Sequence, residues 1–303
     1  MSEQYSQITQ KDGHLSILHA YYCEGTPVAS LVMLHGMAEH EGRYREFALY
    51  MNSMNYDFFI YNHRGHGPEA DKLGHIADEN GQNIVVEDAI RICNYVQENN
   101  RADKLVLMGH SFGSIVARNV IQHKDDFDAV IICGTAALDK MSTYASLAIT
   151  KMISRAKGPG HYSELMNKLS FGGKDYKTVC KESELDWLSV NKDNIARYRA
   201  DHYSGFTCTV GFFHDMSSLL LFGSQKEKIG RTRRTLPIFF IAGAMDPVGG
   251  LGKNVTSLYQ TFVDLGFTNV SIKLYENDRH EILNEDDRAA VMQDITDWLA
   301  KVL

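Results

Sequence analysis

Residues 104–114, K-L-V-L-M-G-H-S-F-G-S, are the stretch that decides the fold of this 303-residue chain. A short apolar run at 105–108 meets G-H-S-F-G, and an apolar helical pattern starts at Ile115. A strand that turns sharply into a helix through G-x-S-x-G is a nucleophile elbow, in which the serine sits on a strained turn. The two glycines leave room for that turn to pack closely. Ser111 is therefore predicted to be a nucleophile, and the protein a serine hydrolase.

Apolar strand patterns alternate with helical patterns on both sides of the elbow. The predicted strands cover 15–22, 31–34, 58–61, 105–108, 129–133, 237–242 and 270–275, and the predicted helices cover 43–54, 83–98, 114–122, 253–265 and 286–301. This alternation predicts an α/β protein with a mostly parallel central sheet covered by helices on both faces.

The alternation stops after Gly134 and resumes at Pro237. The intervening residues look mainly helical and irregular, which predicts an inserted helical cap over the carboxyl ends of the strands, where such sheets bind ligands. We therefore expect a core formed by 1–135 and 235–303, and a cap, or lid, formed by 136–234.

Two later strands end in residues that would complete a catalytic triad. A serine hydroxyl needs a base, and the base needs a third group to orient it. Asp246 follows the strand at 237–242, and His280 follows the strand at 270–275, in the order Ser, acid, His that this kind of elbow requires. Asp246 is predicted to be the acid and His280 the base. The rival acid is Asp278, which lies two residues before His280 and is expected to point elsewhere.

An oxyanion needs two backbone donors. We expect them to be the N–H groups of Phe112, directly after the nucleophile, and of Met37, which follows the Gly36 turn after the strand at 31–34. No metal is expected, because the histidines near these loops lack ligand spacing and hydrogen bonding explains them better. These histidines are His35, His40, His63 and His66. No organic cofactor is implied.

Composition limits the partners and the compartment. The net charge is −7 and no strong basic run is present, which argues against nucleic acid as a partner. The five cysteines are widely spaced and odd in number, as in a cytoplasmic protein with reduced thiols. The N-terminal residues lack the apolar segment of a signal peptide, and no apolar run approaches a membrane span. Transient contact of the cap with a membrane surface and the oligomeric state are left open.

Three longer motifs surround the predicted site: H-G-M-A-E-H-E-G-R-Y at 35–44, N-H-R-G-H-G-P-E at 62–69 and G-H-S-F-G-S at 109–114. They resemble the H-G-x-G-E-H-x-x-R-Y, D-x-R-G-H-G-x-S and G-H-S-M-G-G motifs of the monoacylglycerol lipase and lysophospholipase branch of the α/β-hydrolases, a branch related to the serine aminopeptidase-like group. The resemblance covers about 16–134 and 236–303. The departures are Ala38, Asn62, Pro68-Glu69 and Ser114.

This resemblance implies an α/β-hydrolase fold and a carboxylic-ester hydrolase that acts on a small lipid-like monoester, such as a monoacylglycerol or a lysophospholipid. One alternative is an aminopeptidase or amidase on the same scaffold, which would need a cap carboxylate to bind the substrate amine. Glu164, Glu182 and Glu184 are available for that role. Another alternative is a non-catalytic ligand-binding protein that keeps the fold.

Overall fold

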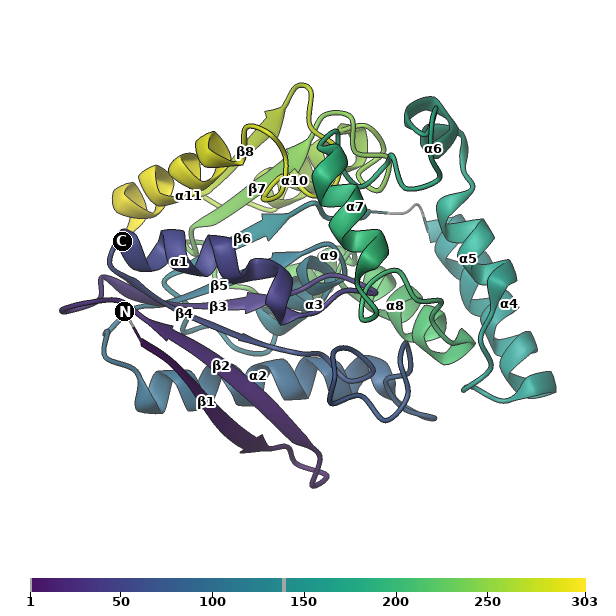
Figure 1. Ribbon diagram of the computed structural model, residues 1–303, viewed down its shortest axis with the longest axis horizontal. Coiled ribbons are helices and arrows are strands. Elements are labelled where there is room, and N and C mark those ends of the chain that lie inside the picture. The colour runs from purple at the N-terminus through teal and green to yellow at the C-terminus, as the bar shows by residue number, and fades with distance from the viewer. Residues whose placement is uncertain (1, 138–139) are drawn as a thin grey trace.

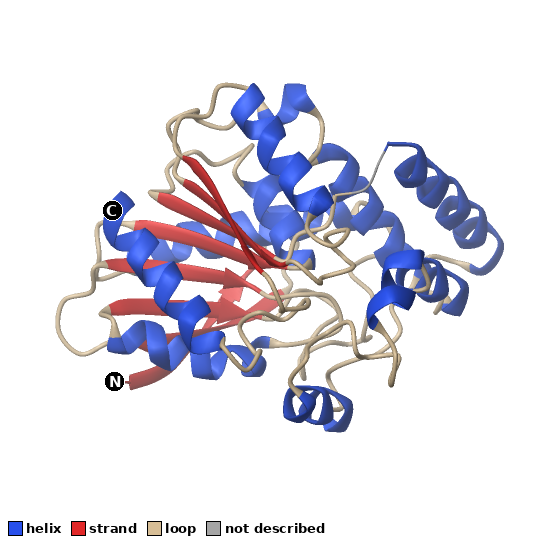
Figure 2. Cartoon of the chain, turned by 90° about the horizontal axis from the view of Figure 1, so that it is seen from above, coloured by secondary structure: helices blue, strands red, loops and turns tan. Residues whose placement is uncertain are grey.

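The computed structural model describes residues 2–137 and 140–303, and an eight-stranded sheet forms its centre. The strand order is β1-β2-β4-β3-β5-β6-β7-β8. The strands are β1 (Ser2–Thr9), β2 (Leu15–Tyr22), β3 (Ala29–Leu34), β4 (Tyr56–Tyr61), β5 (Leu105–His110), β6 (Ala129–Cys133), β7 (Ile238–Gly243) and β8 (Val270–Tyr275). Figure 2 shows these strands between helices.

The sheet is antiparallel at one edge and parallel elsewhere. β2 pairs antiparallel with β1 and β4, whereas β4, β3, β5, β6, β7 and β8 run parallel. Val32 of β3 lies between Phe59 of β4 and Leu107 of β5. Every residue of β3, β4, β5, β6 and β7 is buried, which explains why these strands read as continuous apolar runs rather than as alternating patterns.

Helices cover both faces of the sheet, as the sequence predicts. Helices α1 (Arg45–Ser53) and α11 (Arg288–Val302) pack on one face, next to the 3-10 helix η1 (Glu41–Tyr44). Helices α2 (Gly81–Asn99), α3 (Phe112–Val120), α8 (Val210–Phe222) and α10 (Lys253–Asp264) pack on the other. The two apolar layers meet the sheet from opposite sides because alternate strand residues face opposite ways.

In the described part of the chain, six helices lie between β6 and β7. They are α4 (Lys140–Lys157), α5 (Glu164–Phe171), α6 (Lys174–Val179), α7 (Lys192–Ala200), α8 and α9 (Lys226–Ile229). Figure 1 shows α4, α5 and α6 at the end of the molecule that lies opposite the two chain termini. Within 2–137 and 140–303, no helix combines the length and the apolar character that crossing a bilayer requires.

One strand departs from the sequence expectation. The pattern does not predict β1, because Ile8 alone among its eight residues is buried and the others are mostly polar and exposed. β1 is an edge strand that pairs with β2 through its backbone, so the sheet forms there with little apolar alternation.

Candidate active site

Ser111 stands on the sharp turn between β5 and α3. Its backbone angles are φ 52° and ψ −118°, a region that non-glycine residues rarely adopt. The turn requires glycine on both sides. A Cβ on Gly109 would lie 2.3 Å from the carbonyl oxygen of Gly113, and a Cβ on Gly113 would lie 2.1 Å from that of Leu34. The predicted elbow is therefore present, with its strain at the serine.

His280 and Asp246 meet at the carboxyl ends of β8 and β7. His280 Nδ1 lies 2.9 Å from Asp246 Oδ2, and both side chains are buried. The second carboxylate oxygen of Asp246 accepts the N–H of Val248 at 2.8 Å, which fixes the rotation of the carboxylate. This contact orients the imidazole with Nδ1 towards the acid.

Asp278 is also buried, but Asp246 is the acid that pairs with the His280 ring. Asp278 Oδ2 has no hydrogen-bond partner among the described residues. Burial, together with the neighbouring Asp287 and Glu285 carboxylates, raises the pKa of Asp278 to about 7. Asp278 thus differs from Asp246 in that it does not contact the His280 ring.

The predicted oxyanion loop follows β3 and contains Gly36, Met37 and Ala38. Gly36 N–H donates to Glu39 Oε1 at 2.5 Å, and Ala38 N–H donates to His66 Nε2 at 3.1 Å. Met37 lies between these two occupied amides. Ala38 adopts φ 52°, a left-handed conformation that glycine, the residue of the family motif, adopts more readily than alanine.

Three buried histidines, His35, His63 and His66, lie behind this loop. The rings of His35 and His66 accept hydrogen bonds, as expected from the sequence. The expectation is wrong for His63, because neither of its ring nitrogens has a hydrogen-bond partner among the described residues. His35 Nε2 accepts the N–H of His63 at 3.0 Å, as His66 Nε2 accepts that of Ala38. Burial lowers the pKa of all three rings, that of His66 to about 3, so they are neutral. Among the residues that the structure describes, no cluster of histidine, cysteine or acidic side chains is arranged to hold a metal ion.

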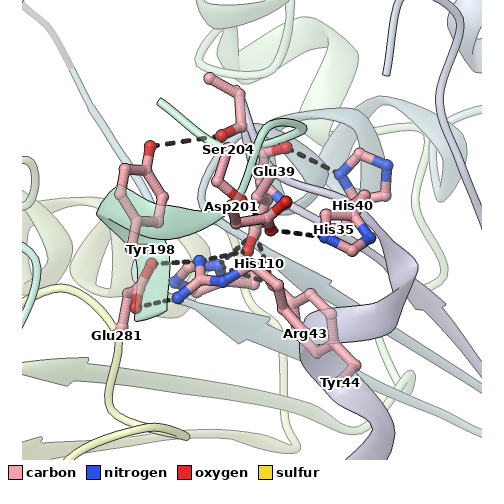
Figure 3. Close-up of polar contacts among 12 residues, drawn as sticks. His35, Glu39, His40, Arg43, Tyr44, His110, Tyr198, Asp201, Ser204 and Glu281 are labelled. Carbon is pink, nitrogen blue, oxygen red and sulfur yellow. Dashed lines mark hydrogen bonds and ion pairs between the residues drawn. The ribbon is translucent and has the colours of Figure 1, made fainter. Parts of the chain in front are cut away.

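A buried ionic network joins the predicted oxyanion loop to the histidine loop, by which we mean the loop after β8 that carries His280 and Glu281 (Figure 3). Arg43 donates to Glu39 Oε2 at 2.9 Å and to both oxygens of Glu281 at 2.6 and 2.7 Å. Asn194 of α7 donates to Glu281 Oε2 at 2.6 Å. Burial alone would raise the pKa of each carboxyl group, but Arg43 helps to keep the pKa of Glu39 and of Glu281 below the usual range.

The segment after α6 docks on the same loops. Trp187 O accepts the N–H of His280 at 3.3 Å, and the centroids of the two rings lie 5.2 Å apart. Ala38 O accepts the hydroxyl of Tyr198 at 3.2 Å and the N–H of Gly205 at 2.9 Å. These contacts connect the segment between β6 and β7 to both sides of the predicted site.

His40 makes a second link to this segment. Its Nε2 lies 2.7 Å from Asp201 Oδ2, and its Nδ1 lies 3.3 Å from Glu41 Oε2. Burial alone would lower the pKa of His40, but the two carboxylates raise it above its ordinary value.

Two further departures from the family motif have local explanations. Asn62 Oδ1 accepts the N–H of Glu41 at 2.9 Å, while Asn62 Nδ2 donates to Glu69 Oε2 at 3.0 Å. An ionised aspartate at this position could not donate to Glu69. Ser114 Oγ donates to the carbonyl oxygen of Ser111 at 2.5 Å, within the first turn of α3.

Sequence reasoning assigned no role to several residues of this network, namely Glu39, Arg43, Tyr44, His110, Asn194 and Glu281. Most of them stand within the quoted motifs. One signal could have indicated their pairing. Several of these residues are charged and stand in motifs next to buried strands, and a buried charge requires a partner.

Comparison with known proteins agrees with this geometry. Residues 25–287 match the family model described as serine aminopeptidase, S33. The chain is 24% identical over 287 residues to a monoacylglycerol lipase of Mycolicibacterium smegmatis, covering 91% of this chain and 90% of that protein. It is 22% identical over 300 residues to a monoglyceride lipase of Rattus norvegicus, covering 97% and 89%.

Among solved structures, a thermostable carboxyl esterase from Bacillus coagulans, in complex with glycerol, superposes with a TM-score of 0.90 at 25% identity. The match covers 100% of this chain and 99% of that one. The expected α/β-hydrolase fold is thus confirmed, and the chain belongs to the serine aminopeptidase S33 family, within which it resembles the monoacylglycerol lipases.

Proposed function

We propose that the protein is a serine hydrolase that cleaves carboxylic esters of small lipid-like molecules, with monoacylglycerols as the substrate class. The observation that carries the proposal is the buried contact of 2.9 Å between His280 Nδ1 and Asp246 Oδ2, combined with Ser111 on its strained turn. An oriented base and a presented hydroxyl are the two requirements of nucleophilic catalysis by serine.

The proposed reaction uses these groups in two steps. Ser111 Oγ attacks the ester carbonyl while His280 takes its proton, and the Phe112 and Met37 N–H groups bind the oxyanion. The alcohol leaves with a proton from His280, and an acyl-enzyme remains. Water then attacks this acyl group with His280 as base, which releases the acid and restores Ser111. Asp246 holds the imidazole tautomer and stabilises its charged form throughout.

Aromatic side chains next to the base favour an acyl substrate. Trp187 stacks on Phe171 with ring centroids 5.1 Å apart, and Tyr176 meets Trp187 edge-on at 5.7 Å. We propose that residues 136–234 act as a cap and that this cluster contributes to its apolar inner side. A buried acyl chain gains about 0.8 kcal/mol per methylene. The two curated relatives described above carry the names monoacylglycerol lipase and monoglyceride lipase.

An aminopeptidase needs a carboxylate to bind the substrate amine. Glu164, Glu182 and Glu184 are all exposed to solvent, and Glu182 is paired with Lys192 at 2.7 Å. A solvated carboxylate binds an ammonium group weakly because water screens the attraction. These observations favour ester over amine-bearing substrates.

Exposed apolar side chains of the proposed cap suit transient contact with a membrane. Met141, Tyr144 and Met152 are 82%, 55% and 65% exposed on α4, and Leu165 and Leu169 are 54% and 55% exposed on α5. Basic side chains lie on the same two helices at Lys151, Arg155 and Lys168. Apolar side chains together with lysine and arginine favour anionic lipid surfaces. The five free cysteines are consistent with a cytoplasmic location, which we also propose.

The nucleophile can be tested by substitution and covalent labelling. Ser111→Ala is expected to abolish ester hydrolysis and labelling by a fluorophosphonate probe, with a loss on the order of 10⁴ or more in kcat. Ser53→Ala, at an exposed serine in α1, is the matched control and should label like the wild type. Labelling that persists in Ser111→Ala would place the nucleophile elsewhere.

The substrate class can be tested with esters of increasing chain length. On wild-type protein, kcat/KM is expected to rise with acyl length until the apolar site is full and then to fall. Equal turnover of acetyl and octanoyl esters would refute the lipid substrate. Much faster turnover of peptides would instead support the aminopeptidase alternative.

A further inference from the structure

We propose that His110, the residue before the nucleophile, is a positioning residue whose ring carries a proton on both nitrogens and holds the backbone of His280 in place. The proposal rests on the proposed function, in which His280 is the catalytic base. It assigns to His110 a role in fixing the distance between nucleophile and base.

The ring of His110 is buried between two loops of the site. On one side, its Nδ1 lies 2.9 Å from the Tyr44 hydroxyl oxygen and 3.3 Å from Glu39 Oε1. On the other side, its Nε2 lies 3.2 Å from the carbonyl oxygen of His280. The ring centroids of His110 and His280 are 4.9 Å apart. His110 thus bridges the oxyanion loop and the histidine loop.

Counting protons assigns the charge of this ring. A carbonyl oxygen can only accept, so Nε2 of His110 must donate to His280. The Tyr44 hydroxyl has one proton, which it donates to Glu39 Oε1 at 2.7 Å. The proton between Tyr44 and His110 must therefore come from Nδ1. Both ring nitrogens are then donors, which is the imidazolium form.

The charges that face His110 support this form. Burial alone would lower its pKa, but the hydrogen bond and charge of Glu39, with a smaller contribution from Glu281, raise it above the ordinary value. Glu39 is the matching anion, because His110 and Arg43 hold its pKa well below the usual range. From the loop after β6, Gly134 packs against the ring and brings no charge.

The consequence concerns the base. His280 is held by Asp246 at its ring, by Trp187 O at its N–H and by His110 at its carbonyl. His110 alone among these three is adjacent in sequence to Ser111. Because a misplacement of about 1 Å can cost 100-fold in rate, this hydrogen bond is expected to act on kcat rather than on substrate binding.

The protonation state can be measured without activity. The thirteen histidines can be compared in two-bond ¹H–¹⁵N spectra of the 303-residue protein. The ring whose signal disappears in His110→Gln should be protonated on both nitrogens at pH 7.5. In Glu39→Gln the pKa of that ring should fall, so the ring should lose its second proton at a lower pH than in the wild type. A neutral His110 ring in the wild type would overturn the proposal. If His110→Gln does not fold, Tyr44→Phe, which perturbs the Nδ1 resonance, identifies the ring instead.

Kinetics test the positioning role with a matched pair. The glutamine nitrogen of His110→Gln can reach the Nε2 position and donate to His280, whereas the asparagine nitrogen of His110→Asn reaches only the Nδ1 position. We expect kcat to fall about 10- to 100-fold in His110→Asn with KM nearly unchanged, and less than about tenfold in His110→Gln. His123→Asn, at an exposed histidine, is the control.

Equal losses in the two variants, or a change in KM alone, would refute the role. Failure of the proposed function looks different. Wild-type protein would then hydrolyse no ester and leave Ser111 unlabelled, while the spectrum of His110 would still report its protonation state.

Discussion

The segment between β6 and β7 has two parts that meet the rest of the protein differently. Residues 186–205 bind the loops of the site through Trp187, Tyr198 and Gly205. Residues 140–171, in α4 and α5, carry large apolar side chains that face solvent. The first part contacts the loops of the proposed catalytic site, and the second carries the apolar surface that we propose contacts a membrane.

Residues 186–205, the anchored part, can support catalysis only if the groups that they contact are catalytic. Asp246→Asn is expected to lower kcat about 10⁴-fold, because the asparagine amide would favour the wrong imidazole tautomer. Asp278→Asn, the matched control in the same region, should lose far less, since Asp246 and not Asp278 pairs with the His280 ring. Steady-state kinetics on one ester give the ranking, and the reverse order would exchange the two assignments.

The contribution of the Arg43 ion pairs to the free energy of unfolding can be measured by substitution. Arg43→Ala leaves Glu39 and Glu281 buried without their cation, so the free energy of unfolding should fall by about 3–5 kcal/mol. Arg45→Ala removes an exposed arginine two residues away and should change it by less than about 0.5 kcal/mol. Urea denaturation measures both values. Similar losses of unfolding free energy in the two variants would mean that the ion pairs of Arg43 do not stabilise the protein.

Acid should lower the free energy of unfolding through His66, which accepts the N–H of Ala38. The pKa of His66 is lowered to about 3 from an ordinary 6.5, so the unfolded chain binds this proton first as the pH falls. The stability is present above pH 6.5 and is lost between about 6.5 and 3, by up to about 1.4 kcal/mol per pH unit. Unfolding free energies measured across this range should depend less steeply on pH in His66→Gln. An unchanged slope would contradict the assignment.

The exposed part should be the most tolerant of substitution. Leu165→Ser with Leu169→Ser should weaken binding to vesicles that contain anionic lipid, yet change the free energy of unfolding by less than about 0.5 kcal/mol per site. Turnover of a short soluble ester should stay within about twofold of the wild type. Vesicle sedimentation provides the measurement, and Leu165→Met with Leu169→Met, which keeps both side chains apolar and uncharged, is the control. Undiminished vesicle binding would remove the argument for a membrane-facing surface.

Some elements of the fold could be predicted from the sequence, and others could not. The core strands, such as 129–133 and 237–242, coincide closely with β6 and β7 because a buried parallel strand imposes a continuous apolar run. The elbow follows from glycines that its turn requires. By contrast, β1 is held by backbone pairing at an edge, which leaves little trace in side-chain character.

The site was predicted less completely than the fold. Ser111 was predicted from its local motif, and His280 and Asp246 from their positions after strands. The structure brings His280 and Asp246 together, and the catalytic roles of the three residues stay predictions. The roles of Glu39 and Arg43 depend on Glu281, which lies 238 residues beyond Arg43 in the chain. No local pattern encodes a contact over that separation, so these charges had no predicted role until the loops were placed together.

The pair formed by Asn62 and Glu69 links two departures from the family motif to each other. The family motif has an aspartate at the first position and a serine at the second. An aspartate at position 62 beside Glu69 would place two carboxylates at hydrogen-bonding distance, where like charges repel. The neutral amide at position 62 avoids this repulsion and donates to Glu69 instead, so the residue that suits position 62 depends on the residue at position 69.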